Sequence, residues 1–91
     1  DPDNPEIHFR LGLCYLRSGL PLDAERSFRE ALRHDPSHVD THLLLGDLFS
    51  SKIPDPDQAT LHYQRFLDNA SKGHPEIPRA RQALKALKNS D

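Results

Sequence analysis

The feature that most constrains this chain is a helix–turn–helix pattern in residues 5–36. Apolar residues at helical spacing begin at Pro5, and a break at Gly19 and Pro21 separates them from a second helical run that ends at Pro36. Proline is favoured in the first turn of a helix and glycine just past its end. The sequence therefore predicts two helices joined by a short turn, which is a helical hairpin.

The hairpin pattern recurs along the chain. Four positions of the first helix reappear 34 residues later in a third helix: Leu11 and Leu45, Gly12 and Gly46, Tyr15 and Phe49, and His8 and His42. Three positions of the second helix reappear 35 residues later in a fourth helix: Ala24 and Ala59, Phe28 and Tyr63, and Leu32 and Leu67. A period of this length indicates stacked helical units. A chain of 91 residues could form only a thin single core. A stacked array does not depend on such a core.

Five helices follow from these patterns. They are expected over residues 5–18, 21–33, 39–52, 56 onward and 78–89. Asn4 and Asp55 are suited to cap the first and fourth helices, because their side chains can accept hydrogen bonds from free backbone amides of the first turn. Gly19 and Gly73 are suited to the left-handed conformation that commonly ends a helix.

Seven positions of the first hairpin resemble the tetratricopeptide repeat, whose signature couples L-G-x2-Y to a later A-x3-F and a closing proline. They are Leu11, Gly12, Tyr15, Ala24, Phe28, Ala31 and Pro36. The resemblance implies an all-α fold in which antiparallel helix hairpins form a right-handed superhelix. It divides a single domain of residues 1–91 into a repeat over residues 5–38, a second over residues 39–73 and a capping helix over residues 76–89. The second unit departs from the signature at Phe66 and Ser71.

The first helix carries two apolar stripes. One consists of Ile7, Leu11, Cys14 and Tyr15, and the other of Phe9, Leu13 and Leu16. We expect the first stripe to pack against the second helix, with Cys14 as a buried packing thiol rather than a reactive one. The second stripe is then left for a further contact.

By the resemblance, the first helices of each hairpin line a concave face that binds peptides. The partner-binding residues expected there are Phe9, Arg10, Leu13, Leu16, Arg17, Leu43 and Asp47. The same face is expected to include Glu6, Asp40, Leu44, Ser50, Arg79, Gln82 and Ala86. The resemblance thus implies a scaffold for protein–protein interaction that takes a partner peptide or helix in this groove. Recognition of acidic chaperone C-termini is not expected, because Phe9 and Leu13 stand where such domains carry Lys and Asn.

Two other uses of the Phe9, Leu13 and Leu16 stripe stay open. The stripe could join copies of the chain in a homo-oligomer, or a preceding repeat of a longer protein could cover it. About three units are needed for independent stability, and two and a half are recognisable here. We therefore expect either a segment of a larger repeat protein or self-association.

Several classes of function are disfavoured by the sequence. No catalytic constellation, cofactor motif or glycine-rich phosphate loop is recognisable, so we expect a binding protein rather than an enzyme, with no cofactor. The net charge of −2 and the lack of a basic stripe disfavour nucleic acid as a partner, RNA included. No apolar run is long enough for a membrane span, and the single cysteine cannot form an internal disulfide. We expect a soluble protein of the cytoplasm or periplasm.

Six histidines raise the question of a metal site. His38 and His42 stand four residues apart on a helix, with His34 nearby, and could share one ion. We expect instead that His8 and His42 are half-buried rings between paired helices, because they hold equivalent places in the two units. His34 falls at the C-terminal end of a helix, where a cation meets the helix dipole favourably. No metal site is predicted.

Overall fold

The computed structural model describes residues 3–89, which form five α-helices and no strand. The helices are α1 (Pro5–Arg17), α2 (Pro21–His34), α3 (Val39–Ser50), α4 (Pro56–Asn69) and α5 (Ile77–Asn89). The predicted all-α fold is confirmed, and the predicted helix boundaries are right to within one or two residues. The predicted domain of residues 1–91 extends at both ends beyond the described residues.

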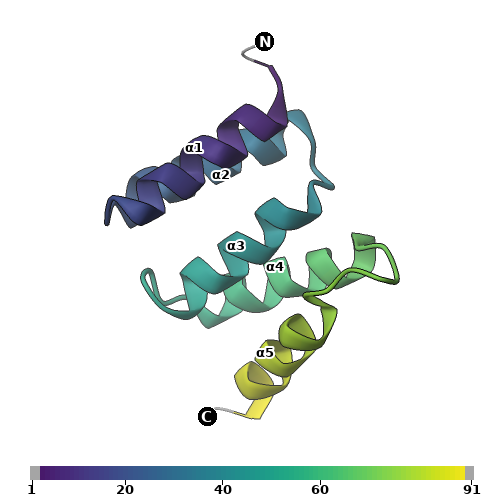
Figure 1. The fold of residues 1–91 in the computed structure, drawn as a ribbon. Coiled ribbons are helices and arrows are strands. Elements are labelled where there is room, and N and C mark those ends of the chain that lie inside the picture. The colour runs from purple at the N-terminus through teal and green to yellow at the C-terminus, as the bar shows by residue number, and fades with distance from the viewer. Residues whose placement is uncertain (1–2, 90–91) are drawn as a thin grey trace.

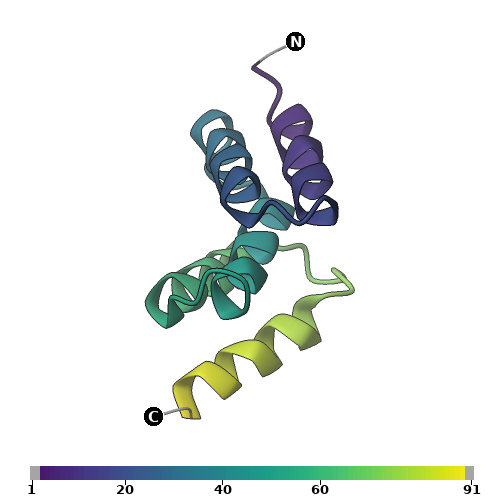
Figure 2. The same cartoon turned by 90° about the vertical axis from the view of Figure 1, so that its left-hand side faces the viewer.

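The helices are arranged as two hairpins followed by a single helix. α1 packs along α2, and α3 packs along α4, while α5 lies against α4 (Figure 1). The view turned by 90° shows the hairpins stacked one above the other, with α5 at the end of the stack (Figure 2). α5 buries Ala80 and Leu84 and exposes its charged side chains, as expected for a helix that caps an array.

Each hairpin is held together by a glycine that faces an aromatic ring. A Cβ added at Gly12 would meet the Phe28 ring, with Cδ1 only 2.6 Å away, and one added at Gly46 would lie 2.8 Å from two ring carbons of Tyr63. The rings fill the space that a side chain would otherwise take, so the two helices approach closely at these points. The 34-residue recurrence in the sequence therefore marks the same packing contact twice.

The helix ends follow most of the predicted caps. Asn4 Oδ1 accepts a hydrogen bond from the Glu6 amide at 2.9 Å, and Asp55 Oδ1 accepts one from the Gln58 amide at 3.2 Å. Gly19 has a φ of 75°, which is the left-handed conformation expected after α1. The same prediction for Gly73 is wrong, because Gly19 is the only glycine with positive φ within residues 3–89. The chain instead leaves α4 through an extended residue, Ala70.

The predicted packing face of α1 is wrong except at Tyr15, which is partly buried and packs against the core. Ile7 and Leu11 are 46% and 43% exposed, and Cys14 is exposed rather than buried. Phe9 is the buried large side chain, and its ring centroid lies 5.9 Å from that of Phe28. The contact between Gly12 and Phe28 fixes the rotation of α1. At 100° per residue, Phe9 and the partly buried Leu16 both lie within about 60° of Gly12, on the same side of it, whereas Ile7 and Cys14 fall on the far side of the helix.

A candidate peptide groove between α1 and α3

An apolar cavity of about 230 Å³ lies where the C-terminal halves of α1 and α3 approach each other. Its lining residues are Leu16 from α1, Leu44, Asp47 and Leu48 from α3, and Ser51 and Lys52 from the turn that follows. Three of these six lining residues are leucines. A cavity of this kind can hold one apolar side chain of a ligand, with the polar groups fixing its orientation.

The turn after α3 is well fixed by hydrogen bonds. The Ser51 hydroxyl donates to the Asp47 carbonyl at 2.8 Å, and the Ile53 amide donates to the Leu48 carbonyl at 3.0 Å. These bonds satisfy carbonyls at the end of the helix, which would otherwise lack intrahelical partners. They also place Lys52 at the edge of the cavity.

Asp47 is the centre of a network that joins α3 to α4 and α5. The Tyr63 hydroxyl donates to Asp47 Oδ1 at 2.6 Å, and Arg79 donates to both carboxylate oxygens, at 2.7 and 3.2 Å. Burial, together with the bond to Asp47, raises the pKa of Tyr63 to about 12. The bond to Asp47 also raises the pKa of Arg79. A bidentate pair of this type fixes geometry, so Asp47 positions α5 beside α3.

Two histidines bridge neighbouring helices on the same side of the molecule. His38, at the start of α3, lies 3.3 Å from a carboxylate oxygen of Glu6 on α1. His74, just before α5, lies 3.1 Å from a carboxylate oxygen of Asp40 on α3. Together with the pair formed by Asp47 and Arg79, these contacts show that α1, α3 and α5 share one face. We call it the α1–α3–α5 face.

Comparison with known proteins identifies the first hairpin. Residues 5–38 match the sequence profile described as Tetratricopeptide repeat. They form a tetratricopeptide repeat. The resemblance inferred from seven positions of the sequence is thereby confirmed. Tetratricopeptide repeats are general modules of protein–protein interaction and typically serve as non-catalytic scaffolds.

One curated relative also contains a matching segment. The chain is 37% identical over 59 residues to a protein of Drosophila melanogaster named Protein O-mannosyl-transferase Tmtc3. The match covers 65% of this chain but 6% of that protein, so the chain spans only a small part of its relative. The transferase activity in that name is a statement about the relative.

The structure brings together only some of the residues that the repeat was expected to present to a partner. Leu16 and Asp47 line the cavity, and Arg10 and Arg17 are exposed. Leu13 is partly buried and packs against the core. Phe9 and Leu43 are 9% and 3% exposed, which leaves them almost no surface for a ligand. Phe9 is covered from within the chain, because its ring also lies 5.3 Å from that of His38.

The sequence did not mark all the residues that line the cavity. The sequence predicts Leu44 on the partner-binding face, but not Leu48, Ser51 or Lys52. Leu48 stands four residues after Leu44, a spacing that places both on one side of α3 and that could have pointed to it. Ser51 and Lys52 follow the helix, so no helical periodicity applies to them.

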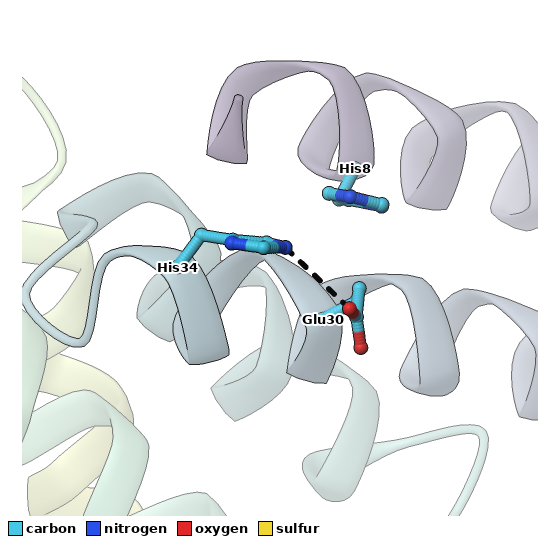
Figure 3. Close-up of side chains that lie close together, drawn as sticks. All are labelled: His8, Glu30 and His34. Atoms are coloured by element: carbon cyan, nitrogen blue, oxygen red, sulfur yellow. Dashed lines mark ion pairs between the residues drawn. The ribbon is translucent and has the colours of Figure 1, made fainter. Parts of the chain in front are cut away.

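The structure separates the three histidines that were considered for a shared ion. His42 lies between the paired helices, as predicted, but it is buried rather than half-buried, and its Nε2 donates to the Pro36 carbonyl at 2.8 Å. His38 lies beside Glu6. His34 instead stacks on His8, with ring centroids 5.3 Å apart, and its Nε2 lies 3.5 Å from a carboxylate oxygen of Glu30 (Figure 3). The set His8, Glu30 and His34 was not recognised in the sequence.

None of the helices within residues 3–89 combines the length and the apolar character needed to cross a bilayer.

Proposed function

We propose that this repeat module binds a segment of a partner protein along the α1–α3–α5 face, with one apolar side chain of the partner seated in the cavity between α1 and α3. The cavity carries the proposal, because it combines three leucines with polar groups at its edge. Leu16 and Leu44, which are partly buried, offer the apolar contact, and Lys52 offers a charge. An anchor residue in a pocket, with a polar rim around it, is the usual arrangement where a few residues dominate binding.

The charges around the cavity suggest the chemistry of the partner. Asp47 is neutralised by Arg79, which lies 2.7 Å away. Neither Arg17, which follows Leu16 in the sequence, nor Lys52 takes part in an ion pair within residues 3–89. A partner segment with a bulky apolar residue next to an acidic one would therefore match this part of the face.

A selection from a displayed library of random peptides tests the proposal. We expect the wild-type chain to select peptides that pair a Leu, Ile or Phe with a neighbouring Asp or Glu. Leu44→Glu should weaken binding of a selected peptide at least about tenfold, because it places a carboxylate against the leucines of the cavity. Lys52→Glu should also weaken it, through repulsion of the acidic residue. Binding is measured by fluorescence anisotropy of the labelled peptide.

Leu61→Glu is the matched control for this experiment. Leu61 is 42% exposed on α4 and does not line the cavity, so its replacement should leave binding unchanged. Circular dichroism of each variant establishes that it is folded. Equal affinity of the wild-type and Lys52→Glu chains for a selected acidic peptide would contradict the predicted chemistry. Binding by Leu44→Glu at wild-type strength would refute the site.

A second function, helix stacking at the edge of the array, is favoured by a different observation. Ile7, Leu11 and Cys14 are exposed on α1, but their equivalents 34 residues later, Thr41, Leu45 and Leu48, are only 0 to 2% exposed. In the second hairpin these positions lie on α3, which α2 contacts. The exposed stripe of α1 therefore has the form of a surface that a helix resembling α2 would cover. Assembly, if it occurs, should use this stripe rather than the buried Phe9.

Sedimentation equilibrium tests whether the exposed α1 stripe joins copies of this chain. If a second copy covers it, the wild-type chain should associate at micromolar concentration, and Leu11→Glu should sediment as a monomer. Leu22→Glu is the control, because Leu22 is 65% exposed on α2 and outside the stripe. A wild-type chain that is already a monomer would exclude self-association through this stripe.

A further inference from the structure

Three potential metal ligands from two helices meet beside the turn that follows α2. His8 comes from α1, and Glu30 and His34 stand four residues apart on α2, so both point from the same side of that helix toward α1 (Figure 3). One nitrogen of each histidine and one carboxylate oxygen all lie within 4.8 Å of one another. All three residues are partly buried rather than extended into solvent.

The donor set is one that zinc can bind. Two imidazoles and one carboxylate are ligands that zinc takes at about 2.0 to 2.2 Å, usually in tetrahedral geometry. Two such ligand atoms then lie roughly 3.3 Å apart, and His34 Nε2 is already 3.5 Å from Glu30 Oε1. The two rings are only 11° from parallel, so the His8 ring must turn about its Cβ–Cγ bond to direct a nitrogen at the same ion.

We propose that His8, Glu30 and His34 bind a zinc ion that links α1 to α2. Three protein ligands leave one coordination position, and Asp3 Oδ1, 4.0 Å from His34 Nε2, is close enough to supply it. The ion would join the N-terminal half of the first helix to the C-terminal end of the second. It would therefore stabilise the tetratricopeptide hairpin, independently of the peptide groove.

Arg33 competes with the ion for the same atoms. Its guanidinium donates to Glu30 Oε1 through Nη2 at 2.6 Å and through Nε at 2.9 Å, and Nη2 also lies 3.2 Å from His34 Nε2. Zinc must displace this guanidinium, and replacing Arg33 should therefore strengthen zinc binding.

Isothermal titration of the full chain with zinc chloride tests the proposal. We expect saturable binding of one ion, and at least about tenfold weaker binding by His8→Ala and by His34→Ala, since loss of an outer partner alone can cost that much. Arg33→Gln should bind more tightly than the wild type. In thermal unfolding, zinc should raise the midpoint of the wild type but not that of His8→Ala, because the ion then no longer spans two helices.

The matched controls are His38→Ala and His74→Ala. Each removes a histidine that lies beside one carboxylate, Glu6 or Asp40, and neither should change zinc affinity. Circular dichroism of the zinc-free variants shows whether each is folded. Arg33→Gln provides a test that does not depend on removing a ligand, because Arg33 is an exposed residue. The proposal is wrong if the wild type takes up no zinc, if His8→Ala binds as tightly as the wild type, or if Arg33→Gln binds no more tightly.

Discussion

Gly12→Leu is expected to lower the free energy of unfolding by about 3 kcal/mol or more. The first added atom would already lie 2.6 Å from Cδ1 and 2.9 Å from Cζ of Phe28. The Phe28 ring is fully buried, and the close packing of protein interiors makes a shift of a buried ring costly. A chain of this length has a total stability of roughly 5 to 14 kcal/mol, so the loss would be a large part of it. The better helix propensity of leucine recovers only about 1 kcal/mol.

Urea unfolding followed by circular dichroism measures this effect, and Gly73→Leu is its control. Gly73 has no heavy atom within 4 Å of an added Cβ and does not have a positive φ, so its replacement should be nearly neutral. The double variant Gly12→Leu with Phe28→Ala should be more stable than the sum of the single losses implies, by about 0.5 to 3 kcal/mol, because the smaller residue makes room. Equal midpoints for Gly12→Leu and Gly73→Leu would show that the hairpin is not closely packed at this point.

The contact between Gly12 and Phe28 also shows how much of the fold could be predicted from the sequence. The recurrence of glycine and aromatic positions gave the number of helices, their pairing and the place of closest approach. The caps at Asn4, Gly19 and Asp55 gave most of the boundaries, because capping depends on residues that are neighbours along the chain. These features are local or periodic, and a sequence records both directly.

The rotation of α1 could not be predicted in the same way. Both of its stripes are apolar, and helical periodicity identifies a stripe without stating which neighbour it meets. The outcome depends on Gly12, whose lack of a side chain admits Phe28 and so turns Phe9 inward. The same ambiguity affects the groove, because the sequence predicts Phe9 as a partner-binding residue and the structure buries it. Predicting the cavity at Leu16 would require the distance between α1 and α3, and the residue pattern of a single helix does not give that distance.

The group formed by His8, Glu30 and His34 was missed for a related reason. Only Glu30 and His34 are near in the sequence, and His8 joins them because α1 and α2 run antiparallel in one particular register. Spacing along the chain favoured His38 and His42 instead. The structure places those two with different partners, because one begins α3 and the other faces into the second hairpin.

The protonation state of the buried pair His42 and His62 follows from its hydrogen bonds. The Pro36 carbonyl can only accept, so His42 Nε2 carries the proton and His42 Nδ1 is an acceptor. His62 Nδ1 must then donate to it across 3.0 Å. His62 Nε2 is left as a buried lone pair, with no hydrogen-bond partner among residues 3–89. A proton added there would have no acceptor, so the folded chain holds this ring neutral.

Stability is therefore expected to fall as the pH is lowered from about 6.5 to about 4. Burial, with the nearby His42 and the charges of Arg29 and Arg65 acting in the same direction, lowers the pKa of His62 from 6.5 to about 4. Burial lowers the pKa of His42 as well. The unfolded chain takes up a proton on His62 throughout this range, whereas the folded chain resists it. The difference between the unfolded and folded pKa values of His62 corresponds to about 3 kcal/mol in the free energy of unfolding. This contribution is fully present above pH 6.5 and is lost as the pH falls toward 4.

His62→Phe should remove most of this pH dependence, because it keeps a planar ring between His42 and Phe49 but cannot take up a proton. Its stability at neutral pH should be lower by about 1 to 3 kcal/mol, since His42 Nδ1 loses its donor. Urea midpoints measured at several pH values separate the two effects, and His38→Gln, which alters a histidine outside the pair, should keep the wild-type slope. If His62→Phe kept that slope, the titrating group would lie elsewhere. A flat profile would show that one unpartnered nitrogen makes the second hairpin sensitive to acid.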